Sequence, residues 1–327
     1  MSAADITEDA PRRPFSGRRV HVGDLLLQLV AGAAAAAATA LVGLIVWKVI
    51  DGARPAIAKE GLAFVTRIAW NPVVGREVFG AASFIFGTAI TSLIALALAA
   101  PLSIGVALFL SELAPRFLRG PVTALVETLA AVPSVVIGLW GIYVLGPVLQ
   151  KHVEPALHSG LGFIPLFGPP GSAGPSIFTA IVVLTMMILP IVSSISRELF
   201  LGVPGELKEG ALALGSTRWE MVRGVVVPYA RGGIAAALIL GLGRAVGEAI
   251  AVTQVIGGGV FIHWNIFSTG DTLASKIAAS YQGAASSLEV SALIYLALIL
   301  LIFSLVANLT AQLIVRRVAR AHGIGGR

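Results

Sequence analysis

Residues Val290–Val315 read VSALIYLALILLIFSLVANLTAQLIV, a run of 26 residues without a charged side chain. A helix needs about 20 apolar residues to cross the hydrocarbon core of a bilayer. The run therefore predicts a transmembrane helix, and it indicates that the chain is a membrane protein.

The composition of the chain is that of a membrane protein. Hydrophobic residues make up 57 % and charged residues 12 %, against roughly 45–50 % and about 25 % in soluble domains. The chain has no cysteine, which excludes disulfides, thiolate metal sites and a cysteine nucleophile. No Walker, HExxH or GxSxG motif is present, so we expect a protein that binds no cofactor, is not an enzyme and does not hydrolyse ATP itself.

Five further apolar segments are long enough to cross a membrane. The segment Val78–Leu110 has 33 residues without a charge, about 50 Å as a helix, so we expect it to bend at Pro101. The other predicted spans are Leu25–Val46, Leu125–Leu149, Ile177–Ser194 and Gly232–Ile256. The predicted fold class is an all-α membrane protein with six transmembrane helices.

The distribution of Lys and Arg predicts the orientation of these helices. With both termini in the cytoplasm, the cytoplasmic segments hold 15 Lys and Arg residues and the outer segments hold 6, in agreement with the positive-inside rule. The predicted order is a cytoplasmic tail (1–24), a first transmembrane helix (25–50), a periplasmic loop (51–80), a domain with the other five spans (81–315) and a second cytoplasmic tail (316–327). In the periplasmic loop, Ile57, Phe64, Val65 and Ile68 form one face of a predicted helix lying on the membrane.

The longest cytoplasmic segment, 196–231, contains a predicted helix, turn and helix. Gly215 ends the first helix, and Ser216 or Thr217 caps the second, which ends at Pro228. The simplest interpretation is an ordinary amphipathic loop.

The spacing of this loop indicates more than that. The order Glu209-Gly210-Ala211, three residues, Gly215, nine residues and Val225–Pro228 resembles the EAA loop of ABC importer permeases. The departures are Gly for the first Ala, and Val for Ile and Leu. In that family a short helix of the loop docks on the ATPase subunit and transmits its closure. The resemblance implies coupling through Glu209, Ala211, Gly215, Trp219 and Pro228.

Two charged residues, Arg244 and Glu248, lie in the middle of the predicted fifth span. A charge there costs at least about 2.5–3.5 kcal/mol on insertion scales. Residues four apart on a helix share a face and can pair, and Gly241, Gly243 and Gly247 leave room for a neighbouring helix or a ligand. The residues alone leave two interpretations open: a structural ion pair, or a site where the guanidinium binds two oxygens of a tetrahedral oxyanion.

Four other polar side chains interrupt apolar runs and are further candidates for lining a path through the membrane. They are Thr88, Ser134, Thr253 and Gln254. For Ser134, which follows Pro133, the alternative is a hydrogen bond to the carbonyl that this proline leaves free.

The segment Gly241–Thr253, GLGRAVGEAIAVT, resembles the fifth-span motif of the PstC-type permease subunits of bacterial phosphate importers. Ser111–Pro115 (SELAP) and Glu127–Gly141 (ETLAAVPSVVIGLWG) match further segments of that family, and the resemblance covers roughly residues 70–315. It implies the type I ABC importer permease fold over 81–315, with phosphate passing Arg244 and Glu248.

The same resemblance implies the partners and the location. They are a PstA-type permease subunit, two PstB-type ATPases that bind ATP and Mg²⁺, and a PstS-type phosphate-binding protein outside the bacterial inner membrane. Three alternatives stay open at this stage: import of another oxyanion such as sulfate or molybdate, an ion-driven secondary transporter or channel that uses Arg244 and Glu248 as a relay, and a membrane scaffold.

Overall fold

The computed structural model describes residues 22–171 and 174–321, which are mostly helical. Six helical segments among these residues are long and apolar enough to cross a membrane: Gly23–Glu60, Ala82–Leu113, Ser134–Leu161, Ile177–Leu201, Arg218–Gly247 and Ser287–Val315. The predicted all-α class and the six spans are therefore confirmed. The predicted tails 1–24 and 316–327 each extend beyond the described residues.

The first helix, α1 (Val22–Glu60), continues past the predicted end of the span at residue 50. It crosses the boundary between two compact units, one ending at Lys48 and the other starting at Val49. The second unit contains the other five spans.

The extension of α1 contains Pro55, which removes one backbone donor from the helix. Next to it, Ser291 of α14 (Ser287–Ala321) enters the helix: its hydroxyl accepts from the Ala56 N–H at 3.1 Å and donates to the Gly52 carbonyl at 2.7 Å. Ser291 therefore bridges two backbone groups that a regular helix joins directly, and ties this part of α1 to α14.

The segment after α1 does not form the single membrane-surface helix predicted over Ile57–Ile68. It folds as a short helix, α2 (Ala63–Thr66), and a two-stranded antiparallel hairpin, β1 (Trp70–Asn71) with β2 (Val78–Phe79). Phe64 is fully buried and stacks on Tyr295 of α14 with ring centroids 4.4 Å apart, whereas Val65 and Ile68 are exposed. The four residues therefore do not share one membrane-facing surface, because Phe64 packs into the protein against α14.

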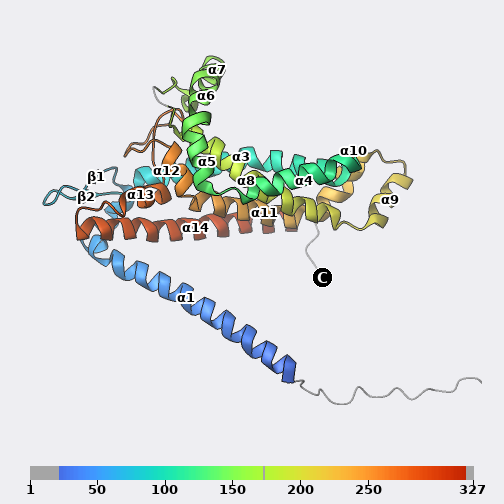
Figure 1. Cartoon of the computed structure of the whole chain (residues 1–327), viewed down its shortest axis with the longest axis horizontal. Helices are drawn as coiled ribbons and strands as arrows, with labels where there is room; N and C mark the ends of the chain where they lie inside the picture. Colours follow the sequence, from blue (N-terminus) through green and yellow to red (C-terminus); the bar gives the residue numbers. More distant parts are fainter. Residues whose placement is uncertain (1–21, 172–173, 322–327) are drawn as a thin grey trace, which may run out of the picture. The chain divides into compact units, whose positions relative to one another are not determined.

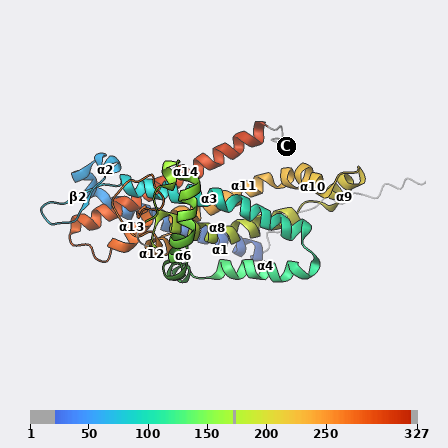
Figure 2. The same cartoon turned by 90° about the horizontal axis from the view of Figure 1, so that it is seen from above.

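The centre of the unit is α8 (Ile177–Leu201), on which α3 (Ala82–Leu108) and α11 (Val227–Gly247) pack (Figures 1 and 2). Ile181, Leu184 and Ile188 recur at helical spacing and are almost fully buried, so they form the core face of α8. A π-helical turn, η1 (Phe109–Leu113), ends α3, and α14 packs along α11. This arrangement keeps the long apolar helices side by side.

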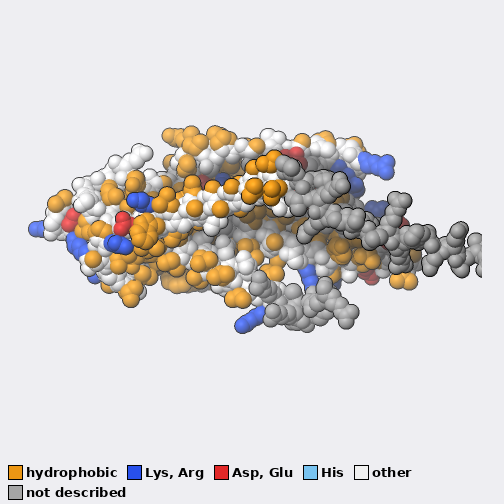
Figure 3. Space-filling view, turned by 90° about the horizontal axis from the view of Figure 1, so that it is seen from below, with side chains coloured by type: hydrophobic (Ala, Val, Ile, Leu, Met, Phe, Trp, Pro, Cys, Tyr) orange, Lys and Arg blue, Asp and Glu red, His pale blue; other side chains and the backbone are white. Residues whose placement is uncertain are grey.

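Apolar side chains cover the length of the surface seen in Figure 3, and most of the charged side chains lie toward its two ends. Many of the exposed side chains are large and apolar, including Leu93, Leu98 and Leu102 of α3. Such a surface is what a bilayer requires, since lipid tails replace water around the helices.

The third span differs from the helix predicted over Leu125–Leu149, because the chain turns at Pro133. α4 (Arg116–Ala131) ends there, and Val132 adopts an extended ψ of 127°, as a residue before proline prefers. The chain then leaves the direction of α4 (Figure 1). The helical segments after the turn are α5 (Ser134–Trp140), η2 (Gly141–Leu145), α6 (Gly146–Val148), η3 (Leu149–Val153), α7 (Glu154–Leu161) and η4 (Pro165–Phe167).

The two ends of the helix bundle carry different structures (Figure 1). One, which we call the α9 end, holds α9 (Gly205–Ala213), α10 (Arg218–Met221) and the π-helical turn η5 (Val222–Val226). The other, the α13 end, holds the hairpin, α12 (Ile250–Val255) and α13 (Leu273–Ser280).

The loop between α9 and α10 confirms two sequence predictions. Gly215 has a left-handed φ of 87° directly after α9, and Thr217 caps α10 by accepting from the Glu220 N–H at 3.3 Å. The prediction that Pro228 ends the second helix is wrong. The chain runs from α10 through η5 into α11 as one continuous helix, and Pro228 lies inside it, directly after the π-helical turn.

Candidate functional site

The fifth span is broken at Glu248, so the single helix predicted over Gly232–Ile256 is wrong. α11 ends at Gly247, Glu248 leaves the helical region with a ψ of 115°, and α12 begins at Ile250. The Glu248 carboxylate accepts through Oε1 from the Ala251 N–H at 3.2 Å. It thereby satisfies one of the backbone donors that the start of α12 leaves open.

The second carboxylate oxygen of Glu248 pairs with Arg244, as the spacing predicted. Oε2 lies 3.2 Å from Nη2 of Arg244 in the last turn of α11. The two side chains differ in exposure: Glu248 is 5 % exposed and Arg244 is 46 % exposed. Glu248 is therefore the fixed partner, and Arg244 projects away from the packed core.

Arg244 lines an open groove between three helices. Its other lining residues are Ile191 of α8, Ala236, Ile239, Leu240 and Gly243 of α11, and Asn308 of α14. Asn308 was not predicted, although it is a polar residue inside the charge-free run that ends the chain's apolar segments. The groove combines one guanidinium and one amide with apolar walls, which suits a small polar solute.

The sequence left two uses open for the glycines beside Arg244: close approach of a neighbouring helix, or room for a ligand. Gly241 and Gly243 each serve a different one. A Cβ on Gly241 would lie 2.9 Å from Ile188 and 3.0 Å from Val192, so this glycine allows α8 and α11 to approach closely. A Cβ on Gly243 would meet nothing within 4 Å, so this glycine keeps the groove open.

Thr88 and Thr253 lie at the α13 end rather than in the Arg244 groove. The buried Thr88 hydroxyl donates to the Phe84 carbonyl at 2.8 Å and accepts from the Leu273 N–H at 2.9 Å. The Thr253 hydroxyl donates to the Ala249 carbonyl at 2.7 Å and lies 3.3 Å from the Ser275 carbonyl. Both hydroxyls hold α13 to its neighbours, and their part in a path stays a prediction.

Ser134 and Gln254 lie where α5 meets α12. Ser134 is the first residue of α5, half-buried after the turn at Pro133. Gln254 packs on Gly138 of α5, and its Oε1 is buried without a hydrogen-bond partner among residues 22–171 and 174–321. The structure does not bring either residue into the groove at Arg244.

A buried charged cluster at the α13 end was not predicted. Asp271 is 9 % exposed and accepts a hydrogen bond from the Ser275 hydroxyl. Burial raises the pKa of Asp271 to about 6 and lowers the pKa of Lys276, whose ammonium lies 5.0 Å from the Trp70 ring centroid. These contacts fasten the hairpin and α13 together.

The predicted coupling residues lie at the α9 end on an exposed surface. Glu209 and Trp219 are exposed, Ala211 is half-buried, and Gly215 is exposed in the turn between α9 and α10. Leu214 is 89 % exposed and Trp219 is 67 % exposed. Leu214 lies between the fourth and fifth spans and Trp219 at the very start of the fifth, and large apolar side chains this exposed at the end of a bundle are typical of a docking surface.

One ion pair that the sequence did not reveal anchors this surface. The Lys208 ammonium of α9 lies 2.6 Å from Oε1 of Glu112 in η1 and donates to the Phe200 carbonyl at 3.0 Å. Both side chains of the pair are largely buried. Glu112 belongs to the SELAP segment and Lys208 precedes Glu209, but nothing in their order along the chain shows that they meet.

Comparison with known proteins agrees with this architecture. A family model described as "Binding-protein-dependent transport system inner membrane component" matches residues 99–320. The phosphate transport system permease protein PstC of Mesorhizobium japonicum is 40 % identical over 330 residues, which cover 99 % of this chain and 100 % of the relative. The chain belongs to the PstC family of permeases. The PstC protein of Pasteurella multocida is 39 % identical over 306 residues, covering 93 % of this chain and 95 % of the relative.

Solved structures show the same fold at lower identity. A bacterial alginate ABC transporter, in complex with an alginate-bound periplasmic protein, contains a chain that is 18 % identical with a TM-score of 0.59, covering 90 % of this chain and 97 % of that one. A chain of the MetNI methionine ABC transporter is 21 % identical with a TM-score of 0.51, covering 71 % and 93 %. A member of the PstC family with this fold is a multi-pass protein of the bacterial inner membrane.

Proposed function

We propose that this chain is the permease subunit of an ATP-driven importer of inorganic phosphate, and that the anion passes the Arg244 side chain. The cargo follows the relatives, which are phosphate transport system permease proteins. The observation that carries the role of Arg244 is its unequal pair with Glu248: the carboxylate is buried and the guanidinium is 46 % exposed in a groove.

The difference in exposure between the Arg244 and Glu248 side chains suits an anion path better than a purely structural ion pair. Arg carries five N–H donors in a planar fork, and a single contact to Glu248 leaves donors that face the groove. A planar fork binds two oxygens of a tetrahedral oxyanion at once. Glu248 holds the fork in position and lowers the net positive charge, so that the anion passes rather than stays.

The partners proposed for this permease account for the rest of its surface. A PstA-type subunit completes the path, and a PstS-type protein delivers phosphate at the α13 end, which we place outside the membrane. Two PstB-type ATPases bind ATP and Mg²⁺ and dock at the α9 end, so that both termini of the chain are cytoplasmic. Closure of the ATPases moves α9 and α10, and this motion opens the path by alternating access.

Phosphate uptake in cells that carry Arg244→Gln as their sole copy tests this proposal. Losing charged hydrogen bonds to the anion should lower uptake by about ten- to a hundredfold. Arg244→Lys keeps the charge but not the planar fork, so its uptake should lie between that of the wild type and that of Arg244→Gln. Arg116→Gln removes an exposed arginine at the start of α4 and serves as the control.

Normal uptake by Arg244→Gln, with a normal amount of protein in the membrane, would refute the role of Arg244. Transport by reconstituted vesicles without ATP would refute the ABC mechanism. Uptake of sulfate or molybdate in preference to phosphate would refute the cargo.

A further inference from the structure

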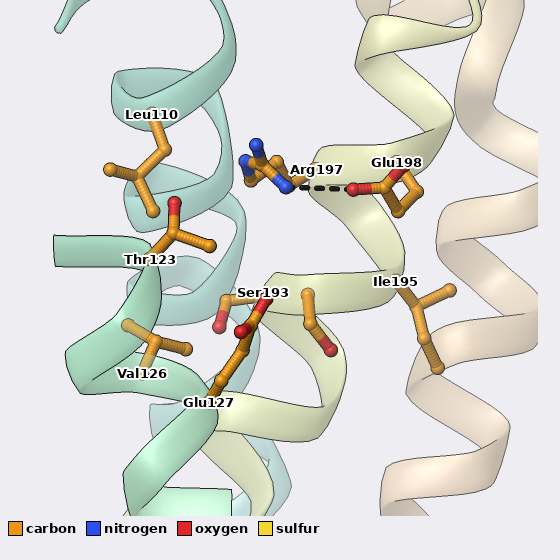
Figure 4. A pocket seen from close by; sticks show the side chains of 9 residues that line it. Leu110, Thr123, Val126, Glu127, Ser193, Ile195, Arg197 and Glu198 are labelled. Atoms are coloured by element: carbon orange, nitrogen blue, oxygen red, sulfur yellow. Dashed lines mark hydrogen bonds and ion pairs between the residues drawn. The ribbon is translucent and has the colours of Figure 1, made fainter. Parts of the chain in front are cut away.

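A second, smaller cavity lies between α4 and α8, next to η1, and has a volume of about 190 Å³. Its polar lining consists of Thr123 and Glu127 from α4 and of Ser193, Ser194, Arg197 and Glu198 from α8, and the Glu198 carboxylate is paired with Arg197. Figure 4 shows Thr123 and Glu127 reaching from α4 toward Ser193 and Arg197. Its size and its mixed polar groups suit one small hydrophilic molecule.

Two hydrogen-bond donors in this cavity have no acceptor. The Thr123 hydroxyl and the Arg197 Nε are buried, and neither has a partner among residues 22–171 and 174–321. The Arg197 Nη1 is already occupied by Glu198 at 2.7 Å, which leaves Nε directed elsewhere. A guanidinium Nε–H can only donate, and an unpaired buried donor is costly. The missing group is therefore an acceptor oxygen.

The Glu127 carboxylate defines the ligand further. An ionised carboxylate accepts hydrogen bonds and repels a bare anion. An oxyanion that keeps a proton avoids this repulsion, because its O–H donates to the carboxylate while its other oxygens accept from Thr123 and Arg197. Inorganic phosphate keeps at least one proton near neutral pH, whereas sulfate keeps none.

The position of the cavity relates it to the Arg244 groove. Ile191 of α8 lines that groove, and Ser194 and Ile195 line the cavity. Ser193 and Arg197, which carry polar groups of the cavity, follow Ile191 by two and six residues and therefore lie on another side of α8, facing α4. The cavity is thus closer to the α9 end than Ile191 and is reached around α8.

We infer that the cavity between Thr123, Glu127 and Arg197 is a second binding site for a protonated tetrahedral oxyanion, filled after the anion leaves Arg244. In the importer proposed above, on which this inference rests, the ligand is inorganic phosphate on its way to the cytoplasm. Arg197 and Thr123 donate to its unprotonated oxygens, and Glu127 accepts from its O–H.

Equilibrium binding of radiolabelled inorganic phosphate to the assembled importer, purified without its phosphate-binding protein, tests the inference. Arg244→Gln is present throughout, so that binding at the first groove does not obscure the second site. Saturable binding is expected in this complex. Arg197→Gln should raise the Kd at least about tenfold, the effect of one charged hydrogen bond lost, and Thr123→Val should raise it about three- to tenfold, the effect of one neutral hydrogen bond lost.

Two variants are matched controls, because Thr123→Ser keeps the hydroxyl and Arg116→Gln removes an exposed arginine of the same helix. Both should keep the Kd within about twofold, since neither removes a proposed contact. Thr123→Val has nearly the shape of threonine, so it tests the hydroxyl even if Arg197→Gln fails to assemble. Glu127→Gln should lower the preference for phosphate over sulfate at least about tenfold, because it removes the repulsion of the bare anion.

Two outcomes overturn the inference: no saturable phosphate binding in a normally assembled complex, or the same Kd for Thr123→Val and Arg197→Gln as for their background. The second outcome would mean that the Thr123 hydroxyl and the Arg197 Nε do not bind an oxyanion. Uptake by the wild-type importer separates this failure from that of the proposed function: Arg244-dependent phosphate uptake with an empty second site refutes the second site alone.

Discussion

The ion pair between Lys208 and Glu112 should connect the ATPase surface to the membrane helices. It joins α9 to η1, the last turn of the second span, across a distance of 2.6 Å. Lys208 is 18 % exposed and Glu112 is 10 % exposed, so water screens the pair weakly. If an ATPase docks at the α9 end as proposed, a displacement of α9 should pass through this contact to α3.

Replacing Lys208 with Met removes the ammonium and keeps the length of the side chain. Breaking a buried pair by removing one partner costs about 3–5 kcal/mol. Because the pair keeps some contact with water, we expect a loss of about 2–3 kcal/mol in the stability of this end of the protein. Glu112→Gln keeps an acceptor for Lys208 and should cost about 1 kcal/mol.

The assay measures ATP hydrolysis and phosphate uptake together, in proteoliposomes that contain the complete importer and its loaded binding protein. Lys208→Met should keep most of the ATPase activity and lower the phosphate imported per ATP by about tenfold, because a loosened α9 moves without α3. Lys59→Met is the matched control. It removes a lysine from the more exposed pair with Glu77, which is 3.4 Å long and 45 % exposed at the lysine, and such pairs contribute about 0–1 kcal/mol.

Two results would refute this reasoning. One is an unchanged ratio of uptake to hydrolysis in Lys208→Met. The other is additivity, in which the Lys208→Met and Glu112→Gln double variant loses the sum of the two single effects, since residues that act through one contact are not additive.

Three further predictions concern the α13 end and the broken span. Glu248→Gln should keep α12, because its amide oxygen still accepts from the Ala251 N–H, but should lower uptake at least about tenfold because the charge beside Arg244 is lost. Glu248→Ala should lower both uptake and the melting temperature of the complex. Equal melting temperatures of the two variants would contradict the capping role of Glu248. Burial raises the pKa of Asp271 from 3.8 to about 6, so the folded protein holds that proton more tightly and the free energy of unfolding falls as pH rises from about 4 to about 6. Asp271→Asn should abolish this fall and raise stability at pH 7 by about 3 kcal/mol at most, measured by thermal unfolding across that pH range. Gly87→Ala should destabilise the folded protein by about 1–3 kcal/mol, because the added methyl group meets the Asp271 carbonyl oxygen. Gly105→Ala is the control, since its methyl group would meet nothing within 4 Å. Equal melting temperatures of the two variants would contradict the close packing at Gly87.

The local predictions succeeded where short-range physics decides the outcome. Long charge-free runs have to be buried in lipid, so the six spans followed from the sequence. The turn at Gly215 and the cap at Thr217 depend on a few adjacent residues, and both were found where predicted. Arg244 and Glu248 pair because they lie four residues apart.

The predictions failed where contacts that the apolar pattern does not show decide the fold. α1 continues past residue 50, where the first span was predicted to end, and its extension hydrogen-bonds to Ser291, far away in the sequence. Glu248 breaks the fifth span because its carboxylate stabilises the start of a new helix, which no periodicity of the apolar residues reveals.

The sequence by itself determined the membrane class, the number of spans and the two charges in the fifth span, because hydrophobicity and spacing act along the chain. Only the tertiary structure decided which of those charges is exposed, that Lys208 meets Glu112, and that Thr123 and Arg197 share a cavity with Glu127. These contacts join helices that are distant in sequence, and their geometry depends on how the spans pack rather than on any local preference.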